Sequence, residues 1–277
     1  MPEGGTGVVS MPGLHTIVCL KVVPKSEEVT INPETRTLDR SKARSEINGA
    51  DLNALEAALR LKDAHGGRIS LLSMGPPFFE RYLRLALAMG TDAAYLMSDR
   101  AFGGADTLAT SYTLAAGIRA IGSFDLVLCG EESSDGATGS VPPGIAEWLG
   151  VSQMTYATHL QVLPRQRLLR GRRELRGGFE VVEAPLPCVV SIKLGVNEPR
   201  FLDFDRWDWA MHKAPLTVWT AADLGLKEDV IGLPGSPTTV ATMDTAPTAE
   251  RRREFLRGTL REQIELLLQR IGQWIPA

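Results

Sequence analysis

Cysteine is scarce in this chain, and the few cysteines present form no ligand or disulfide pattern. The 277 residues include three, Cys19, Cys129 and Cys188, each inside an apolar run and none in a CxxC pair. Secreted disulfide scaffolds and zinc frameworks need more cysteines at closer spacing. We therefore expect a reducing compartment, the cytoplasm, and no zinc framework.

Long apolar runs and an excess of one charge are also missing. No run approaches the roughly 18 residues of a membrane-spanning helix, and residues 1–14 lack the order of a signal peptide, a basic region followed by an apolar one. The 30 basic and 33 acidic residues leave a formal net charge of −3, which gives no overall electrostatic footprint for nucleic acid. We expect a disordered leader over 1–14, no membrane insertion and no nucleic-acid partner.

Motifs of catalysis are absent as well. The four histidines, at positions 15, 65, 159 and 212, are far apart and none lies in an HExxH pattern, and no GxSxG elbow occurs. The glycine-rich leader GGTGVVSMPG precedes the first expected strand, whereas a dinucleotide fingerprint follows one. The sequence therefore gives no support for a metal site or for nucleophilic hydrolysis.

What the sequence does contain is a regular alternation of short apolar runs and helical patterns, which is typical of strand-helix-strand units and a parallel sheet. The expected strands are 16–23, 68–74, 93–99 and 124–130. The expected helices are 52–64 with Asp51 as N-cap, 78–90, and 107–121 with Asp106 as N-cap. These elements predict an α/β domain over residues 15–213.

The pattern changes along the second half of the chain. Residues 155–193 alternate apolar and polar side chains, with turn signals in LRGRREL and LRGGFE, which predicts added antiparallel strands. Residues 214–248 are rich in proline and glycine and look loose. The segment 214–277 is therefore interpreted as a linker followed by a C-terminal arm.

That arm contains a long amphipathic helix in 249–275. Its apolar face consists of Leu256, Leu260, Ile264, Leu267 and Ile271. Because such a helix is stabilised mainly by burying its apolar face, it needs a surface to pack on. A partner subunit is the economical answer, and packing on its own domain is the alternative.

The loop that follows strand 124–130 is the most informative stretch. It reads GEESSDGATGSVPPG from Gly130 to Gly144, and the helix after it is expected to begin at Pro142 or Pro143. Free N–H groups near Val141 and Gly144 and hydroxyls of Thr138 and Ser140 would surround one spot at a helix N-terminus, which suits a phosphate. From the residues alone, a flexible capped loop is an equal alternative.

Several segments together resemble the β subunit of electron transfer flavoprotein. They are VCLKVVP (18–24), INGADLNALEAALRLKD (47–63), LLSMGPP (71–77), LALAMGTDAAYL (85–96), DLVLCG (125–130), SDGATGSVPPGIAEWLG (134–150) and LPCVVSIKLGVNEPRF (186–201). The resemblance implies a Rossmann-like parallel sheet of the adenine-nucleotide-hydrolase-like type, without hydrolase activity. It also implies a heterodimer with an α subunit that carries the FAD and receives the C-terminal arm. On this resemblance the chain is an electron carrier subunit without bond-making chemistry of its own, and not an enzyme.

The resemblance assigns a cofactor site. Its residues would be Cys19, Asn48, Met74, Gly130, Asp135, Gly136, Ala137, Thr138, Gly139, Ser140 and Val141. In the family the β subunit holds AMP or, in the electron-bifurcating branch, a second FAD. That branch typically reads Asp-Gly-Asp-Thr-Ala-Gln-Val-Gly-Pro here, and this sequence departs from it at Ala137, Gly139, Ser140 and Pro142. We favour AMP, with a second FAD as the alternative.

The resemblance also assigns a docking loop, KLGVNEPRF. Val196, Asn197, Glu198 and Arg200 would meet flavin dehydrogenases, such as the acyl-CoA dehydrogenases of fatty acid β-oxidation, with Val196 in the place of a leucine anchor. Electrons would leave through a quinone reductase or another acceptor oxidoreductase. A structural turn at Asn197-Glu198-Pro199 is the plainer alternative. For the whole chain, the rival is a stand-alone adenine-nucleotide-binding regulatory protein.

A basic cluster remains outside these assignments. It comprises Arg165, Arg167, Arg170, Arg172, Arg173 and Arg176, interleaved with leucines. This spacing predicts an exposed hairpin. Its charge belongs either to a solvated face or to a docking surface for an acidic redox partner.

Overall fold

A computed structural model describes residues 13–25, 30–31, 38–39, 44–239 and 255–272 of the chain. The chain divides into two compact units, Met1–Thr242 and Met243–Ala277. They are described separately below.

The first unit is built on one nine-stranded sheet with the order β11-β10-β9-β12-β8-β1-β6-β7-β13. The strands are β1 (Leu14–Cys19), β6 (Gly67–Met74), β7 (Ala93–Met97), β8 (Leu126–Gly130), β9 (Ser152–Leu163), β10 (Leu168–Leu175), β11 (Gly178–Pro185), β12 (Cys188–Ile192) and β13 (Leu216–Trp219). The pairs from β9 through β12, β8, β1, β6 and β7 to β13 are parallel, and β10 pairs antiparallel with both β9 and β11. The predicted Rossmann-like, mostly parallel sheet with added antiparallel strands is confirmed.

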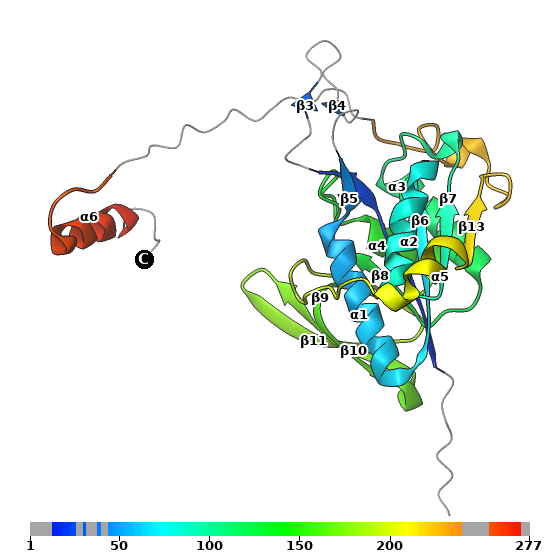
Figure 1. Cartoon of the computed structure of the whole chain (residues 1–277), viewed down its shortest axis with the longest axis horizontal. Coiled ribbons are helices and arrows are strands. Elements are labelled where there is room, and N and C mark those ends of the chain that lie inside the picture. Colours follow the sequence, from blue (N-terminus) through cyan, green and yellow to red (C-terminus); the bar gives the residue numbers. More distant parts are fainter. Residues whose placement is uncertain (1–12, 26–29, 32–37, 40–43, 240–254, 273–277) are drawn as a thin grey trace, which may run out of the picture. The chain divides into compact units, whose positions relative to one another are not determined.

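Helices cover both faces of this sheet (Figure 1). They are α1 (Gly49–His65), α2 (Glu80–Ala88), α3 (Thr107–Ile121), α4 (Val141–Leu149) and α5 (Trp207–His212). Val18 of β1 packs with α1 and α2 in one apolar core, and its neighbour Ile17 packs with α3 and α4 in the other. Because β1 is covered on both faces, all six of its residues are buried, and its last three, Ile17 to Cys19, are consecutively apolar instead of alternating.

Short elements fill the connections. Two small antiparallel pairs are formed by β2 (Val22–Pro24) with β5 (Ser45–Ile47) and by β3 (Thr30–Ile31) with β4 (Leu38–Asp39). Single 3-10 turns are η2 (Pro77–Phe79), η3 (Arg100–Phe102), η4 (Pro164–Gln166), η5 (Phe204–Arg206) and η6 (Glu228–Val230). The first of these takes the place of the predicted start of the second helix, so α2 begins at Glu80.

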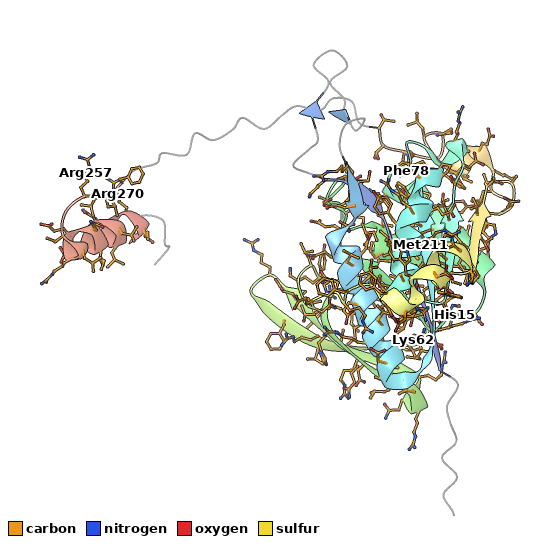
Figure 2. The ribbon with its side chains drawn as sticks, viewed as in Figure 1. His15, Lys62, Phe78, Met211, Arg257 and Arg270 are labelled. Carbon is orange, nitrogen blue, oxygen red and sulfur yellow. The ribbon has the colours of Figure 1, made fainter. Side chains whose placement is uncertain are left out.

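The amino ends of the parallel strands carry their own buried polar contacts. His15 of β1, labelled in Figure 2, contacts the Ser123 carbonyl through Nδ1 and the Ser70 hydroxyl through Nε2. Burial lowers the pKa of His15, with the nearby Arg68 acting in the same direction. Lys62 of α1 reaches both carboxylate oxygens of Asp92 at 2.7 Å. These contacts stabilise the edge of the sheet opposite the loops discussed below.

Three expectations about elements were wrong. The segment 214–248 was expected to be loose, but β13 adds to the edge of the sheet beside β7, and its four residues are too few to show a period in the sequence. β12 was expected in an antiparallel set, but it lies between β8 and β9 and is parallel to both. LRGRREL forms strand β10 and not a turn; the reversal before it is η4.

The start of the first strand also differs from the expectation. Leu14 was assigned to the leader, yet it opens β1, pairs with Gly67 and is buried. The strand therefore begins before the predicted residue 16. It ends at Cys19, and Val22 and Val23 belong to the separate strand β2.

The basic cluster lies on η4, β10 and the turn after it, as an exposed hairpin. Arg170 pairs with Glu183 at 2.6 Å and Arg173 with Glu180 at 3.1 Å on the neighbouring strand. Leu169 is the fully buried member of the interleaved leucines. Cross-strand pairing thus accounts for part of this charge.

The C-terminal unit contains the helix α6 (Leu260–Gly272). Thr259 and Glu262 form a capping box, in which the Thr259 N–H and hydroxyl both donate to the Glu262 carboxylate. This cap begins the helix later than predicted, so Leu256 precedes it. Apolar side chains of α6 are exposed; they are Leu260, Ile264, Leu266, Leu267, Leu268 and Ile271. Among the described residues, no helix has the length and apolar character needed to cross a membrane.

Candidate functional site

The candidate site lies at the carboxyl ends of two neighbouring strands, β1 and β8. One buried carboxylate binds the backbone at both of these strand ends. Asp51, in the first turn of α1, accepts the N–H of Gly130 at 2.9 Å through Oδ1 and the N–H of Lys21 at 2.7 Å through Oδ2. Gly130 ends β8, and Lys21 follows the end of β1. The start of α1 is therefore fastened to the carboxyl edge of the sheet, where open α/β sheets bind ligands.

Asp51 was predicted to be the N-cap of this helix, and that prediction was wrong. The helix begins three residues earlier than predicted, at Gly49 with Asn48 in the N-cap position, and the Asp51 carboxylate binds the N–H groups of Lys21 and Gly130 at the end of the sheet. Burial raises the pKa of Asp51 to about 6, against the opposing effect of hydrogen bonds from Lys21, Asn48 and Gly130. Burying a carboxylate is unfavourable, so its presence here indicates that its hydrogen bonds are needed to hold the start of α1 against the sheet.

Gly130 allows this close approach. A Cβ at position 130 would lie 2.4 Å from Asp51 Oδ1 and 2.7 Å from the Cβ of Ala50. No other residue fits without moving the start of α1. The glycine therefore sets the spacing between α1 and the loop that leaves β8.

Asn48 holds the first half of that loop. Its side chain is buried, its Nδ2 donates to the carbonyl of Glu132 at 2.8 Å, and its Oδ1 accepts the N–H of Ser134 at 3.2 Å. Both ends of the amide thus bind the chain itself. In this arrangement Asn48 positions the loop.

Lys21 is a cation beside the loop that the sequence reasoning did not identify. Its Nζ lies 2.5 Å from Asp135 Oδ1 and 3.1 Å from the hydroxyl of Ser133. The sequence analysis assigned no cation to this loop. The signal was present in the sequence, since Lys21 directly follows a strand that ends at the same edge as β8.

The second half of the loop, 136–141, turns through left-handed backbone. Ala137 has φ 46° and Gly139 has φ 60°. No hydrogen bond within the described part of the chain uses the N–H groups of Thr138, Gly139 or Val141. Successive unused N–H groups in such turns form concave anion sites.

The loop enters α4 differently from the expectation. The helix begins at Val141, with the prolines at its second and third positions. The N–H of Gly144, which was expected to be free, donates to the Ser140 carbonyl at 3.1 Å. The donors left for an anion are therefore those of the loop and of Val141.

Apolar residues end the two strands that follow β8 in the sheet order, at the same carboxyl end of the sheet as the loop. Cys19 ends β1 and is buried, and Met74 ends the adjacent strand β6 and is half-buried against the core of the α3 and α4 face. The Cys129 thiol contacts Cys19, and this contact together with burial raises its pKa. An unreactive apolar surface at this end of the sheet fits the base of a nucleotide.

The loops after β8 and β12 are joined by Glu131. Its Oε1 accepts the N–H of Leu194 at 2.9 Å, its Oε2 lies 3.9 Å from Lys193 Nζ, and its own N–H donates to the Ile192 carbonyl. This contact was not anticipated from the sequence. It places the expected docking loop directly beside the expected nucleotide loop.

The docking loop is itself fastened to α1. Asn197 and the buried Asn53 exchange hydrogen bonds of 2.7 to 3.0 Å, and Arg200 pairs with the buried Glu56 at 2.9 Å and with Asp63 at 2.8 Å. Asn197 and Arg200 are thus engaged within the chain, which agrees with a structural turn.

The remaining residues of that loop divide between core and solvent. Val196 is half-buried and packs against the chain's own core, while Glu198 is exposed. Leu194, which the sequence reasoning did not select, is 60% exposed. An apolar contact with a partner is therefore offered by Leu194 more than by Val196.

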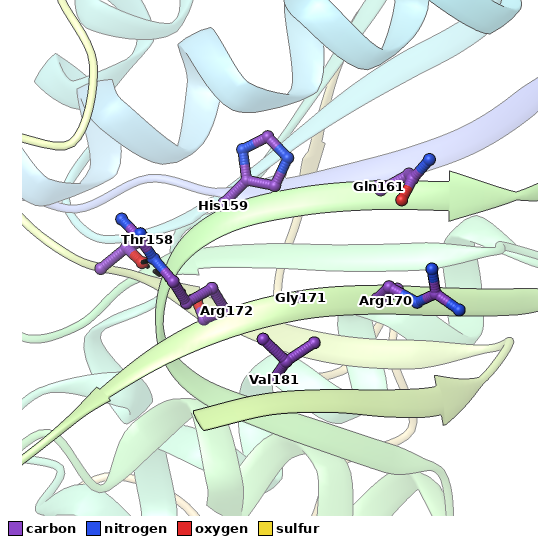
Figure 3. A pocket seen from close by; sticks show the side chains of 7 residues that line it. All are labelled: Thr158, His159, Gln161, Arg170, Gly171, Arg172 and Val181. Atoms are coloured by element: carbon purple, nitrogen blue, oxygen red, sulfur yellow. Dashed lines mark hydrogen bonds between the residues drawn. The ribbon is translucent and has the colours of Figure 1, made fainter. Parts of the chain in front are cut away.

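A hollow outside this site lies on the antiparallel extension (Figure 3). It is lined by Thr158, His159, Gln161, Arg170, Gly171, Arg172 and Val181, from β9, β10 and β11. Arg170 is paired with Glu183, and Arg172 lies over the Phe179 ring. We assign it no ligand. In the described ranges, no three histidine, cysteine or acidic side chains cluster in a way that could hold a metal ion.

Comparison with known proteins agrees with the geometry. The family model described as electron transfer flavoprotein domain matches residues 35–224. The chain is 41% identical over 247 residues to the caffeyl-CoA reductase-Etf complex subunit CarD of Acetobacterium woodii, covering 89% of this chain and 93% of that protein. It is 44% identical over 232 residues to an electron transfer flavoprotein subunit beta of Clostridium acetobutylicum (84% and 88%). It is 39% identical over 268 residues to protein FixA of Bradyrhizobium diazoefficiens (93% and 91%).

Proposed function

Since this chain belongs to the electron transfer flavoprotein family, among its β subunits, we propose that it pairs with an α subunit that carries the redox FAD. Proteins of this family transfer electrons and are not enzymes in the ordinary sense. The exposed apolar face of α6 supports a partner, because no described contact buries it within its own unit. The arm would then pack on the α subunit.

The nucleotide that we assign to this subunit is AMP, held structurally. The single observation that supports it most is the cradle of N–H groups at Thr138, Gly139 and Val141 that no described hydrogen bond uses, in the loop whose Asp135 contacts the Lys21 ammonium. Donors of this kind fit a phosphate group. Cys19 and Met74 would supply an apolar surface for the base.

A second FAD is the alternative occupant. Its adenosine phosphates would use the same cradle, and the loop keeps Asp135, Gly136, Thr138, Val141 and Pro143 of the pattern of the bifurcating branch. The bound flavin would then supply redox chemistry within this subunit. Whichever nucleotide is bound, the chain's own residues bind, orient and shield it, with Asp51 and Asn48 fixing the loop.

The electron donors that we propose are flavin dehydrogenases that act on acyl-CoA compounds. The name of the Acetobacterium woodii relative places that protein in a complex with a caffeyl-CoA reductase, which supports a partner of this class. The loop at 193–200, with its exposed Leu194, is the proposed contact surface. The acceptor would be a quinone reductase or another oxidoreductase.

The test is to purify the chain together with its α subunit and to identify the released nucleotides by mass spectrometry. One flavin and one AMP per heterodimer is the expected result. Two flavins and no AMP would replace AMP with a second FAD. A stable, colourless protein that binds adenine nucleotides without any partner would instead support the stand-alone regulatory protein.

A further inference from the structure

We propose that Lys21 is the cation that recognises the nucleotide phosphate, and that Asp135 holds its ammonium over the loop until the phosphate takes it. This inference rests on the proposed nucleotide site and adds to it the residue that reads the charge of the ligand. It also gives the acidic side chain of Asp135 a role that opposes binding.

The backbone of Lys21 is fixed, so that only its side chain can change partner. Its N–H donates to Asp51 at 2.7 Å, and its carbonyl accepts the N–H of Asn48 at 2.9 Å. Both partners also bind the phosphate loop or its first residue, Gly130. The root of the side chain is thus placed against the loop by the same residues that shape the loop.

The side chain of Lys21 is 46% exposed, whereas that of Asp135 is 10% exposed. An ammonium group has three N–H donors, and the contacts with Asp135 and Ser133 use two of them. The flexible four-carbon stem allows the ammonium to turn to a new acceptor without moving the backbone. The Lys21 end of this pair is half exposed, and solvent screens its charge, so the pair adds little to stability from that side. Removing the Lys21 charge is therefore expected to leave the fold intact.

The charges around the loop favour this exchange. Glu131, Glu132 and Asp135 make the loop acidic, which opposes a phosphate. Glu131 is directed away, toward Leu194 and Lys193. Among the described residues, Lys21 is the ammonium that contacts Ser133 and Asp135 of the loop. A phosphate with two negative charges competes for it more strongly than one carboxylate does.

The competition has opposite consequences for the two partners. Lys21→Gln removes the attraction for the phosphate and is expected to weaken AMP binding about tenfold. Asp135→Asn removes the competitor and a repulsive charge, so AMP binding is expected to be at least as tight as in the wild type. Adenosine, which lacks the phosphate, is expected to bind all variants alike.

The experiment measures equilibrium uptake of labelled AMP and of labelled adenosine by the purified complex of this chain with its α subunit. The variants are Lys21→Gln, Lys21→Arg and Asp135→Asn. Lys213→Gln is the matched control, because Lys213 forms an exposed pair with Asp208 at 2.6 Å on α5. Lys21→Arg keeps the positive charge, so this variant is expected to bind AMP more tightly than Lys21→Gln and nearly as tightly as the wild type.

Two results overturn the inference alone: wild type and Lys21→Gln bind AMP equally, or Asp135→Asn weakens AMP binding as much as Lys21→Gln. If Lys21→Gln weakened adenosine binding as much as AMP binding, the inference would also be overturned, because the weaker binding would then come from a distortion of the loop. A wild-type complex that takes up no AMP overturns the proposed AMP site itself.

Discussion

Asp51 and Gly130, which are 79 positions apart in the sequence, are joined by a 2.9 Å hydrogen bond from the Gly130 N–H to the buried Asp51 carboxylate. The bond fixes the start of α1 against the first residue of the phosphate loop. Because a second oxygen of the same carboxylate binds the Lys21 N–H, one side chain sets the positions of two loops. The consequences of its burial can be measured.

The stability of the protein is expected to fall as the pH rises through the titration of Asp51. Burial raises its pKa from the usual 3.8 to about 6 in the folded state, so the folded protein binds the proton more tightly than the unfolded chain. The stabilising effect of the proton is complete below about pH 4 and is lost by about pH 6, which amounts to about 3 kcal/mol.

Asp51→Asn removes this titration and should flatten the profile, measured by urea unfolding from pH 4 to pH 7. The variant also loses one hydrogen bond, which shifts its whole curve downward by about 1 kcal/mol. Asp208→Asn, at an exposed carboxylate, is the control. Parallel curves for wild type and Asp51→Asn would contradict the prediction.

Alanine substitutions at Gly139 and Gly150 can distinguish the effect of backbone strain from the effect of steric crowding. Both adopt left-handed φ, 60° and 68°, but a Cβ at 139 would lie 2.8 Å from the Tyr156 hydroxyl, while nothing lies within 4 Å of one at 150. Each change to alanine should cost about 1 kcal/mol of stability. Gly139→Ala should cost about 1 kcal/mol more and should also weaken nucleotide binding, measured by calorimetry. If Gly150→Ala weakened binding as much, the effect would not be specific to the loop.

Arg200 and Arg60 both pair with Glu56, but they should differ in importance. Burial alone would raise the pKa of Glu56, yet hydrogen bonds from Arg200 and Arg60 bring it below its usual value. Arg200 is partly buried, whereas Arg60 is more exposed. Arg200→Gln should therefore cost about 1–3 kcal/mol at neutral pH, and Arg60→Gln less than about 0.5 kcal/mol.

The sign of the pH effect is the opposite of that for Asp51. The lowered pKa of Glu56 gives stability that is present above its usual 4.5 and is lost as the pH falls through the folded value. Arg200→Gln should diminish this acid-side loss, measured by thermal unfolding at pH 3 to pH 6. Equal effects of the two arginine variants would show that the loop at 193–200 is not held through Arg200.

The exposed face of α6 should be required for assembly. Ile264→Glu together with Leu267→Glu places two charges on that face and should abolish copurification with the α subunit, because burying an unpaired charge is costly. Arg261→Ala removes an exposed pair with Glu265 and serves as the control. Copurification of the double variant at the wild-type ratio would contradict the predicted role of the arm.

The parts of the fold that were predicted correctly are those with a local signal. Asp106 was recognised as a cap because its carboxylate bonds the next N–H groups along the chain, Leu108 and Ala109. The parallel sheet followed from apolar runs spaced by helical patterns. In the same way, the phosphate loop was marked by glycines and prolines at a strand-to-helix junction.

The parts that were missed depend on contacts between distant segments. Asp51 looks like a cap locally, and only the approach of Gly130 makes it a buried clamp. Lys21 is placed at the loop by its contact with Asp135, which lies 114 positions later in the sequence. The half-buried state of Val196 likewise depends on packing that no local pattern encodes.

The position of β12 between β8 and β9 bears on how the chain acquires its structure during synthesis. Strand β12, residues 188–192, pairs with β8 on one side and with β9 on the other. The strands β9, β10 and β11 therefore cannot join β8 in one sheet until nearly two hundred residues have been made. Sheets closed by such distant pairings fold slowly and expose strand edges meanwhile. Until β12 is made, β8 can pair with β1 beside β6 and β7, but its other edge stays unpaired. We therefore expect the nascent chain to be prone to aggregation during that interval.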